Sequence, residues 1–254
     1  MHKTVQDILK MKKEKKKISV ITSYDYTLAS LCDKAGIDVL LIGDSAGMVM
    51  LGYENTIPVT MDQMCMFTEA VSRARKDSLL VSDLPFMSYQ ASIEDAINNS
   101  GKLIKAGADA IKLEGGSIMA ETINAIVDVG IPVMGHIGLQ PQTTMLSEGY
   151  KVQGKTKDSA MKLIEDAKEL EDAGVFSTAL EMVSHEVAQI ISETVSVPVI
   201  GIGSGVNCDG QVLVVHDLLG MYEKIKPKIA KRYMNLSEDI VKALEDYRKD
   251  VKSV

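Results

Sequence analysis

Cysteine is scarce in this chain. Its 254 residues include three cysteines, Cys32, Cys65 and Cys208, and these lie far apart. An odd number at such spacings fits neither a disulfide framework nor a cysteine-based zinc motif. The composition therefore favours a reducing compartment, and we predict a cytoplasmic protein.

Positive charge and long apolar runs are also lacking. The formal net charge is −7, which argues against the basic surface of a nucleic-acid-binding protein. The one basic cluster, residues 10–17 (KMKKEKKK), contains an acid and is predicted to be the solvated end of an N-terminal helix. No apolar run is long enough to span a bilayer, and the N-terminus lacks the apolar segment of a signal peptide. We expect no nucleic-acid partner and no membrane partner.

No low-complexity linker divides the chain, so we predict a single domain over residues 1–254. A pattern repeats along it: a short apolar run, a polar or glycine-rich loop, and an amphipathic helical stretch. The predicted strands span residues 17–25, 38–44, 78–85, 110–116, 132–139, 176–183, 198–205 and 210–217. Helical patterns lie between most of them, for example at residues 92–106, 157–173 and 186–193.

This alternation predicts an α/β fold, a closed (β/α)8 TIM barrel with an extra N-terminal helix. An open doubly wound sheet is the alternative, and it would require many of these strands to be misassigned. The weakest link joins the last two strands, because residues 206–209 are too few for a crossover helix. Residues 210–219 fit either a strand or a helix.

Polar or glycine residues end nearly every predicted strand. They are Asp25, Asp44, Ser45, Asp83, Lys112, Glu114, His136, Glu181 and the glycines of residues 201–205. In a (β/α)8 barrel the carboxyl ends of the strands form one mouth, where active sites lie. A single such residue is often only part of a turn. Several carboxylates at one mouth, however, repel each other and require a cation or protons.

Three of these acids, Asp44, Asp83 and Glu114, belong to three successive strands. Carboxylates without an accompanying Cys or His pair suit Mg²⁺ better than Zn²⁺. The alternative is that some of them form salt bridges to Lys112 or bind helix N-termini. Lys112 and Glu114 are two residues apart in a strand and so share a face, where a cation beside a metal suits a chelating anionic substrate.

Glu181 follows an apolar strand, a setting that suits a general acid or base, although an ion pair is the alternative. His136 lies near glycines on both sides and fits a structural role as well as a catalytic one. The glycines Gly201, Gly203 and Gly205 could cradle an anion with backbone N–H groups. They lack the context of a dinucleotide-binding motif.

Several long segments match one known family in the family's own order. They are TSYDYTLA (22–29), IGDSAGMVMLGYENTIPVTMDQM (42–64), DLPFMSY (83–89), IKLEGG (111–116), GHIGLQPQ (135–142), GYKVQGKT (149–156), IGIGSG (200–205) and DGQVLVVHDLLG (209–220). With these segments the chain resembles the ketopantoate hydroxymethyltransferase (3-methyl-2-oxobutanoate hydroxymethyltransferase) family over nearly its whole length.

The resemblance implies a (β/α)8 barrel that transfers a one-carbon unit with Mg²⁺. The implied donor is 5,10-methylenetetrahydrofolate, the acceptor is the 2-oxo acid 3-methyl-2-oxobutanoate, and the product is 2-dehydropantoate, the first committed step of pantothenate synthesis. It also implies a homo-oligomer, typically a decamer.

The resemblance further assigns roles to residues of the strand ends. The implied metal ligands are Asp44, Asp83 and Glu114, and the implied catalytic base is Glu181. The implied contacts to the 2-oxo acid are Asp44, Ser45, Asp83 and Lys112. We place His136 and Gly203 on the substrate or folate side.

Two other functions stay open. Another Mg²⁺-dependent barrel acting on 2-oxo acids, such as the phosphoenolpyruvate mutase and isocitrate lyase group, also uses carboxylates at strand ends. The cysteine-containing loop of that group has no evident counterpart between Gly116 and Met134. A non-catalytic anion-binding protein on the same scaffold would be expected to have lost metal ligands, whereas all three acids are present.

Overall fold

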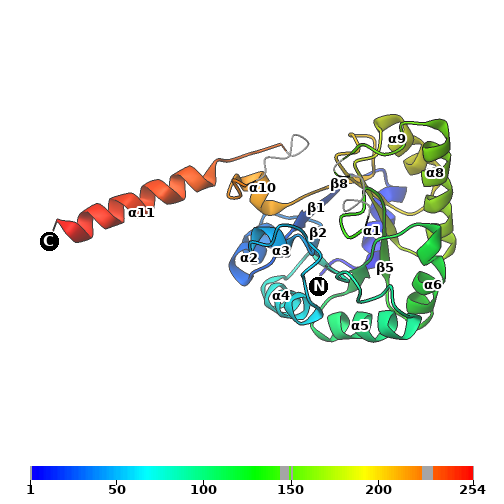
Figure 1. Ribbon diagram of the computed structural model, residues 1–254, viewed down its shortest axis with the longest axis horizontal. Helices are drawn as coiled ribbons and strands as arrows, with labels where there is room; N and C mark the ends of the chain where they lie inside the picture. The colour runs from blue at the N-terminus through cyan, green and yellow to red at the C-terminus, as the bar shows by residue number, and fades with distance from the viewer. Residues whose placement is uncertain (1, 144–148, 150, 225–230, 254) are drawn as a thin grey trace. The chain divides into compact units, whose positions relative to one another are not determined.

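The fold is a closed barrel of eight parallel strands in sequential order, which confirms the predicted (β/α)8 architecture (Figure 1). The computed structural model describes residues 2–143, 149, 151–224 and 231–253. The strands are β1 (Ile18–Thr22), β2 (Val39–Ile42), β3 (Leu79–Asp83), β4 (Ala110–Lys112), β5 (Val133–Gly138), β6 (Ser177–Glu181), β7 (Val199–Ile202) and β8 (Gly210–Leu213).

Helices follow most of the strands. They are α1 (Val5–Lys13), α2 (Tyr26–Lys34), α3 (Ala46–Val49), α4 (Met61–Ala74), α5 (Ile93–Lys105), the 3₁₀ turn η1 (Ser117–Met119), α6 (Ala120–Asp128), α8 (Lys157–Asp172), α9 (His185–Thr194), α10 (Val215–Leu219) and α11 (Leu236–Lys252). Three of them, α2, α5 and α8, end at an alanine followed by a glycine with positive φ. This is the helix stop that the Ala-Gly pairs of the sequence predict.

The structure corrects one detail of the predicted elements, the length of the strands, and it resolves two points at the end of the barrel that the sequence left open. The strands are shorter than predicted, because their polar ends leave the sheet and form the loops at the mouth of the barrel. The link from β7 to β8 contains no helix, so the alternation of strands and helices is interrupted there. Residues 210–219 combine both predicted structures, since a strand ends at Leu213 and a short helix begins at Val215.

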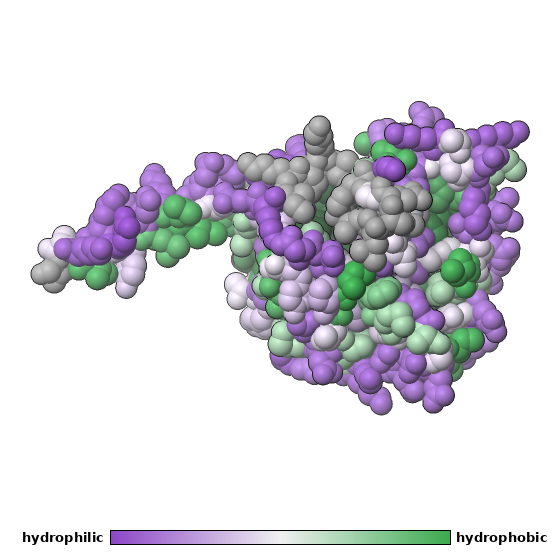
Figure 2. Space-filling view, viewed as in Figure 1, coloured by the Kyte–Doolittle hydropathy of each residue, from purple (hydrophilic) through white to green (hydrophobic). Residues whose placement is uncertain are grey.

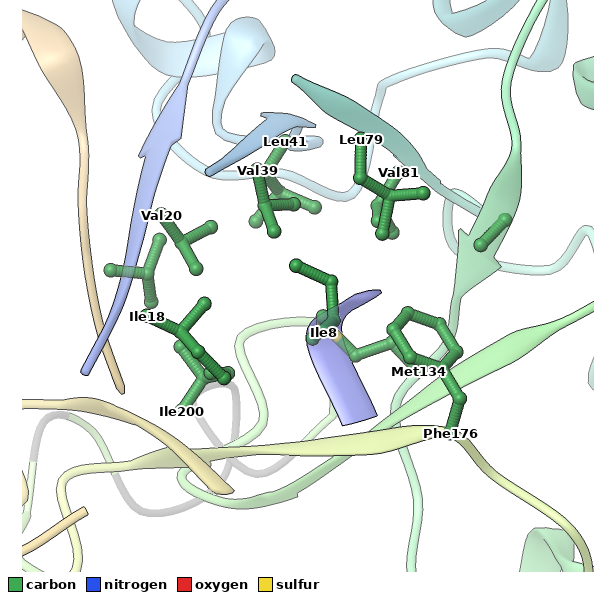
Figure 3. Packing of buried hydrophobic residues seen from close by; sticks show 12 residues of the cluster. Ile8, Ile18, Val20, Val39, Leu41, Leu79, Val81, Met134, Phe176 and Ile200 are labelled. Carbon is green, nitrogen blue, oxygen red and sulfur yellow. The ribbon is translucent and has the colours of Figure 1, made fainter. Parts of the chain in front are cut away.

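The N-terminal helix α1 closes one end of the barrel. Ile8 of α1 belongs to the hydrophobic core, together with inward-facing residues of the strands such as Val20, Leu41 and Val81. Figure 3 shows Ile8 at the centre of the ring that these side chains form. Burying an isoleucine of this kind contributes roughly 1.5–3 kcal/mol, so α1 is an integral part of the core.

Lys12 is the exception in the basic cluster, whose other lysines are exposed as predicted. Its Nζ donates to Ser192 O at 2.9 Å and to Val197 O at 2.8 Å, and it pairs with Asp209 Oδ2 at 2.9 Å. This one lysine therefore connects α1 to the end of α9 and to the residues that precede β7 and β8.

Charged residues replace apolar ones along the inward face of the barrel. In β3, Leu79 and Val81 lie in the core, and Asp83 occupies the next position on the same face. In β4, Ala110 lies in the core and is followed on that face by Lys112. The core therefore fills the end of the barrel near α1, and the charged side chains gather at the carboxyl ends of the strands.

The chain divides into two compact units, Met1–Val212 and Leu213–Val254. The first contains the barrel core and every candidate site residue. The second contains α10 and α11, joined by backbone hydrogen bonds such as Ser237 N to Gly220 O at 3.2 Å. The prediction of one domain over residues 1–254 stays a prediction. Among the described helices, none combines the length and apolarity needed to cross a bilayer.

Candidate active site

Asp83 and Lys112 form a buried ion pair at the mouth of the barrel. They are register partners across β3 and β4, which places Lys112 Nζ 2.8 Å from Asp83 Oδ2. Burial alone would lower the pKa of Lys112, but the surrounding carboxylates, Asp83 foremost, raise it above its usual range. The lysine is therefore a permanent cation, and the salt bridge considered from the sequence is present.

Asp44 lies beside this pair, on the loop that follows β2. Its backbone N–H donates to Asp83 Oδ2 at 3.2 Å, and its own Oδ2 accepts from Gln142 Nε2 at 2.8 Å. Burial, and next the nearby charge of Asp83, raise the pKa of Asp44 to about 7. Asp44 is therefore a buried acid whose charge the surrounding chain does not fully offset.

Glu114 is the third buried carboxylate. Its Oε2 accepts the backbone N–H of Gln142 at 3.0 Å. Burial and the charge of Asp44 raise the pKa of Glu114 well above its ordinary value. Among the described residues, three carboxyl groups surround the ammonium of Lys112, so they require protons or a further cation, as the sequence predicted for this mouth.

His136 lies between two of the acids. Its Nδ1 is 3.6 Å from Glu114 Oε1, and its Nε2 is 3.4 Å from Glu181 Oε2. Both distances exceed those of good hydrogen bonds, and neither ring nitrogen has a hydrogen-bond partner among the described residues. The imidazole therefore lies beside Glu181. Of the two acids that flank it, Glu181 has the more accessible side chain, at 15% exposure.

Gly138 permits the close approach that positions Glu181. Its φ of +98° suits glycine, and a Cβ there would lie 2.2 Å from the carbonyl oxygen of Glu181. That oxygen instead accepts the backbone N–H of Leu139 at 2.8 Å. The glycine that ends β5 therefore brings the end of β6, and with it Glu181, against the neighbouring strand.

Ser45 also lies at the mouth, where its Oγ is 2.8 Å from the hydroxyl of the buried Tyr24. Gly43 leaves room for this turn, because a Cβ at that position would lie 2.7 Å from Ser45 Oγ. Ser45 is thus held at a fixed place one residue after Asp44.

Two candidates from the predicted strand ends, Asp25 and Gly203, have surroundings unlike those of the buried acids. Asp25 caps α2 by accepting the backbone N–H of Leu28 at 2.9 Å, so it is a turn residue. Gly203 lies in the link after β7, where the neighbouring Ser204 donates to Leu180 O at 2.8 Å and accepts from Val183 N at 3.0 Å. These hydrogen bonds join the link to β6 and to the residues that follow it.

The site could hold a divalent cation through two of its acids. Over the described part of the chain, no three or more His, Cys, Asp or Glu side chains converge closely enough to form a metal site by themselves. Asp83 Oδ1, however, is buried without a hydrogen-bond partner in that part of the chain, and Asp44 lies directly beside it. Mg²⁺ is usually bound by one or two carboxylates and completes its shell with water and substrate, so the residues fit this ion.

Two residues of the site escaped sequence reasoning. Gln142 and Tyr89 are both buried and join Asp44 to Glu114 through a chain of hydrogen bonds. Each is the last residue of a segment quoted above for the resemblance, GHIGLQPQ and DLPFMSY. Their positions in those segments were the available signal, but as uncharged side chains they were not considered among the candidate acids and bases.

Comparison with known proteins supports the assignment that the segments predict. The model of the family described as ketopantoate hydroxymethyltransferase matches residues 2–254. The chain belongs to the ketopantoate hydroxymethyltransferase family. The 3-methyl-2-oxobutanoate hydroxymethyltransferase of Nitrosopumilus maritimus (strain SCM1) is 89% identical over 253 residues, which cover 100% of this chain and 91% of that protein.

A second relative supports the same family. The 3-methyl-2-oxobutanoate hydroxymethyltransferase of Cenarchaeum symbiosum (strain A) is 58% identical and covers 95% of this chain and 91% of its own length. The resemblance predicted from the segments is thus confirmed, and with it the assignment to hydroxymethyltransferase enzymes.

Among solved structures, a phosphonopyruvate hydrolase in complex with oxalate and Mg²⁺ has a TM-score of 0.66 at 10% identity, with 99% of this chain and 88% of that chain covered. A 2,3-dimethylmalate lyase of the PEP mutase/isocitrate lyase superfamily has a TM-score of 0.61 at 14% identity, with 100% and 89% covered. At such low identity these structures support the barrel fold of this chain and nothing beyond the fold.

Proposed function

We propose that this chain transfers a hydroxymethyl group from 5,10-methylenetetrahydrofolate to 3-methyl-2-oxobutanoate in a Mg²⁺-dependent reaction. The reaction consumes one water and yields 2-dehydropantoate and tetrahydrofolate. The observation that carries the proposal is the grouping of Asp44, Asp83, Lys112 and Glu114 beside Glu181 at one mouth of a barrel of this family.

The proposed roles follow from charge and position. Asp44 and Asp83 would hold Mg²⁺, with Glu114 as a further acid of the metal site. When bound, Mg²⁺ would polarise the ketone of the 2-oxo acid and favour its enolate. Lys112, already paired with Asp83, would offset the negative charge of the substrate carboxylate, and Ser45 would contact that carboxylate.

Glu181 is proposed as the base that takes the proton from C3 of the 2-oxo acid. The electron pair of that C–H bond then forms the enolate, whose C3 bonds to the methylene carbon of the folate. Both C–N bonds of that carbon break, and the water supplies the hydroxyl oxygen of the new hydroxymethyl group. The two folate nitrogens gain the proton lost from C3 and one proton of the water, which gives tetrahydrofolate. His136, beside Glu181 at 3.4 Å, is proposed to lie on the same substrate or folate side, as is Gly203. Glu181 suits this role because it is more accessible than the acids around Lys112.

Exchange of the C3 hydrogen with solvent tests the role of Glu181. The protein is incubated in D₂O with Mg²⁺ and 3-methyl-2-oxobutanoate, without folate, and loss of the C3–H signal is followed by ¹H NMR. We expect Glu181→Gln to slow exchange by at least about 10²–10⁴-fold while binding of the 2-oxo acid is largely kept. The matched control is Glu186→Gln, which alters an exposed acid at the start of α9.

The outcomes separate the functions under consideration. Unchanged exchange in Glu181→Gln would remove this residue from the base role. Absence of folate-dependent one-carbon transfer in the unmodified protein, with and without Mg²⁺, would instead contradict the proposed function. Turnover of a 2-oxo acid without folate would favour the lyase or mutase alternative.

A homo-oligomer is also proposed, decameric as in the resemblance. Helix α11 supports self-association, because Ile240, Leu244, Tyr247 and Val251 recur on one face at exposures of 41–68%. Figure 2 shows apolar side chains of α11 among charged ones. Its first turn is acidic and its last turn basic, so an antiparallel second copy would be complementary in charge. Sedimentation velocity of the full chain tests this, and a monomer contradicts it.

A cytoplasmic location stays a proposal. It is supported by the three cysteines, all of which are free thiols. Burial raises the pKa of Cys32 to about 11, so this thiol remains protonated and unreactive.

A further inference from the structure

Gln142 is a fully buried glutamine, 1% exposed, on the link that follows β5. Its Nε2 donates to Asp44 Oδ2 at 2.8 Å and to Leu84 O at 3.0 Å. Its Oε1 accepts from the Tyr89 hydroxyl at 2.8 Å and from Gln90 Nε2 at 3.3 Å. Every hydrogen-bonding position of this amide is therefore used.

These partners determine which way the amide faces. The carboxylate of Asp44 and the carbonyl of Leu84 can only accept, so they require the NH₂ group of Gln142. A flipped amide would place its oxygen against both of these acceptors. The Tyr89 hydroxyl accepts the backbone N–H of Glu114 at 3.1 Å. Its own proton has two acceptors within reach, and Gln142 Oε1 at 2.8 Å is nearer than Glu114 O at 3.1 Å.

The same residue also contacts the second buried acid. The backbone N–H of Gln142 donates to Glu114 Oε2 at 3.0 Å, while its side chain donates to Asp44. Asp44 follows β2 and Glu114 follows β4, so one residue binds one oxygen of each of two carboxylates that repel each other. Its hydrogen bonds go to Asp44 Oδ2 and Glu114 Oε2, while Glu114 Oε1 lies 3.6 Å from His136 Nδ1.

We propose that Gln142 is a positioning residue for the cation site, oriented by Tyr89 so that its amide holds the carboxylate of Asp44 in a cation-binding orientation. This inference rests on the proposed function, because it concerns the site assigned to Mg²⁺. Hydrogen bonds from outside the ligand set orient metal-binding carboxylates, and their loss typically costs about 10–100-fold in metal affinity.

The test is Mg²⁺ binding by isothermal titration calorimetry to the full-length protein without substrates. Gln142→Met has a similar length but removes the amide, and it keeps the backbone bond to Glu114. We expect its Mg²⁺ affinity to fall about 10–100-fold. Gln140→Met, the same substitution two residues earlier on the same link, should bind Mg²⁺ as the unmodified protein does.

Tyr89→Phe provides a second variant in case Gln142→Met does not fold. It keeps the ring in the core and leaves Gln142 in place, but removes the hydroxyl that orients the amide. We expect a smaller loss of Mg²⁺ affinity, roughly 3–10-fold, with circular dichroism confirming the fold. A purely structural role would lower the melting temperature and leave the affinity of the folded protein unchanged.

The outcomes distinguish this inference from the proposed function. If the unmodified protein binds Mg²⁺ and folded Gln142→Met or Tyr89→Phe binds it equally well, the positioning role is wrong and the proposed function is unaffected. If the unmodified protein binds no Mg²⁺, the Mg²⁺ dependence in the proposed function and this inference both fail.

Discussion

Acidic side chains at the two ends of the barrel have different surroundings. Asp38, Asp109 and Asp209 each precede a strand, and each accepts the backbone N–H of a residue in the strand before it, at 2.9 Å. Each also meets a cation: Lys3, Arg75 and Lys12, respectively. At the other end, Asp44, Asp83 and Glu114 have Lys112 as their one close cation among the described residues.

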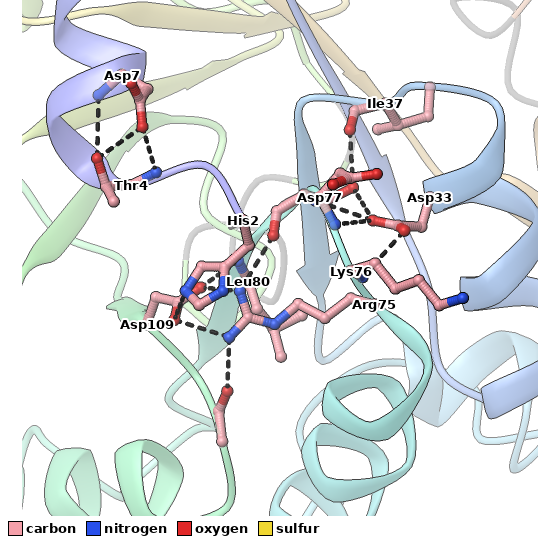
Figure 4. Close-up of polar contacts among 12 residues, drawn as sticks. His2, Thr4, Asp7, Asp33, Ile37, Arg75, Lys76, Asp77, Leu80 and Asp109 are labelled. Carbon is pink, nitrogen blue, oxygen red and sulfur yellow. Dashed lines mark hydrogen bonds and ion pairs between the residues drawn. The ribbon is translucent and has the colours of Figure 1, made fainter.

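Asp33, at the same end of the barrel as Asp38, Asp109 and Asp209, accepts hydrogen bonds at both of its carboxylate oxygens. Its carboxylate accepts three backbone N–H groups, those of residues 76–78, at 2.8–3.1 Å, and the hydroxyl of Ser78 at 2.8 Å. Figure 4 shows this group and, at the same end, Asp109 paired with both Arg75 and His2. Burial alone would raise the pKa of Asp33, but these hydrogen bonds, those from Ser78 foremost, hold it below its ordinary value.

The comparison separates acids that stabilise the fold from acids that we propose to bind a cation. Hydrogen bonds and cations supplied by the chain lower the free energy of the folded state, as at Asp33 and Asp109. At the opposite end the pKa of Asp44 is raised to about 7, because its charge is buried beside that of Asp83. The chain does not neutralise this negative charge fully, so a cation from solution would be attracted to it.

The largest expected effect comes from removing an acid at the site end. Asp83→Ala deletes a proposed metal ligand and the partner of Lys112, so we expect activity to fall by at least about 10³-fold. Calorimetric titration should show weakened Mg²⁺ binding, while the protein remains folded. Asp77→Ala, which changes an exposed acid at the other end, is the control. A titration equal to that of the unmodified protein would show that Asp83 is not a ligand.

Asp109→Ala is expected to have an intermediate effect, and on stability instead of on activity. This change leaves the guanidinium of Arg75, which is 10% exposed, without its carboxylate. We expect the free energy of unfolding to fall by about 2–3 kcal/mol, somewhat below the cost for a fully buried pair because Asp109 is 21% exposed. Activity at a temperature where the variant is folded should be unchanged.

Urea denaturation measures this loss. The exposed pair of Glu69 and Arg73, with side chains 55% and 65% exposed, provides the control, and Glu69→Ala should have little effect. A variant at Asp109 that lost activity but no stability would break the proposed division between the two ends.

The smallest effect is the dependence of stability on pH without Mg²⁺. The raised pKa of Asp44 means that the folded chain keeps a proton which the unfolded chain releases near pH 3.8. Stability from this proton is complete below about pH 4 and is lost as the pH rises to about 7. Asp33 acts in the opposite sense: its contribution is present above pH 3.8 and is lost as the pH falls through its lowered pKa.

Thermal unfolding in EDTA between pH 5 and 8 measures this difference. We expect the melting temperature to fall by a few °C over this range, and Asp44→Asn to flatten the fall. Asp33→Asn should leave the slope unchanged. A slope that is insensitive to Asp44→Asn would mean that Asp44 does not retain this proton.

Part of the site could be predicted because strand ends are visible in the sequence. Asp44, Asp83, Lys112 and Glu114 each follow or end an apolar run, and closing the barrel brings such positions together. The sequence does not distinguish these acids from Asp38 or Asp109, which also flank strands. Gln142 could not be predicted as a partner of Asp44, because the two are 98 residues apart and no local pattern connects them.

The sequence by itself determined the alternation of strands and helices, the glycine stops of α2, α5 and α8, and the inward apolar positions. These depend on periodicity and backbone preferences that act over a few residues. The tertiary structure alone decided that Ile8 closes the barrel and that Lys12 bonds to residues near β7 and β8. It also decided that hydrogen bonds stabilise the charge of Asp33, whereas the charge of Asp44 is not fully offset. Neutralisation of a charge depends on partners from distant segments, and barrel closure decides which of them meet.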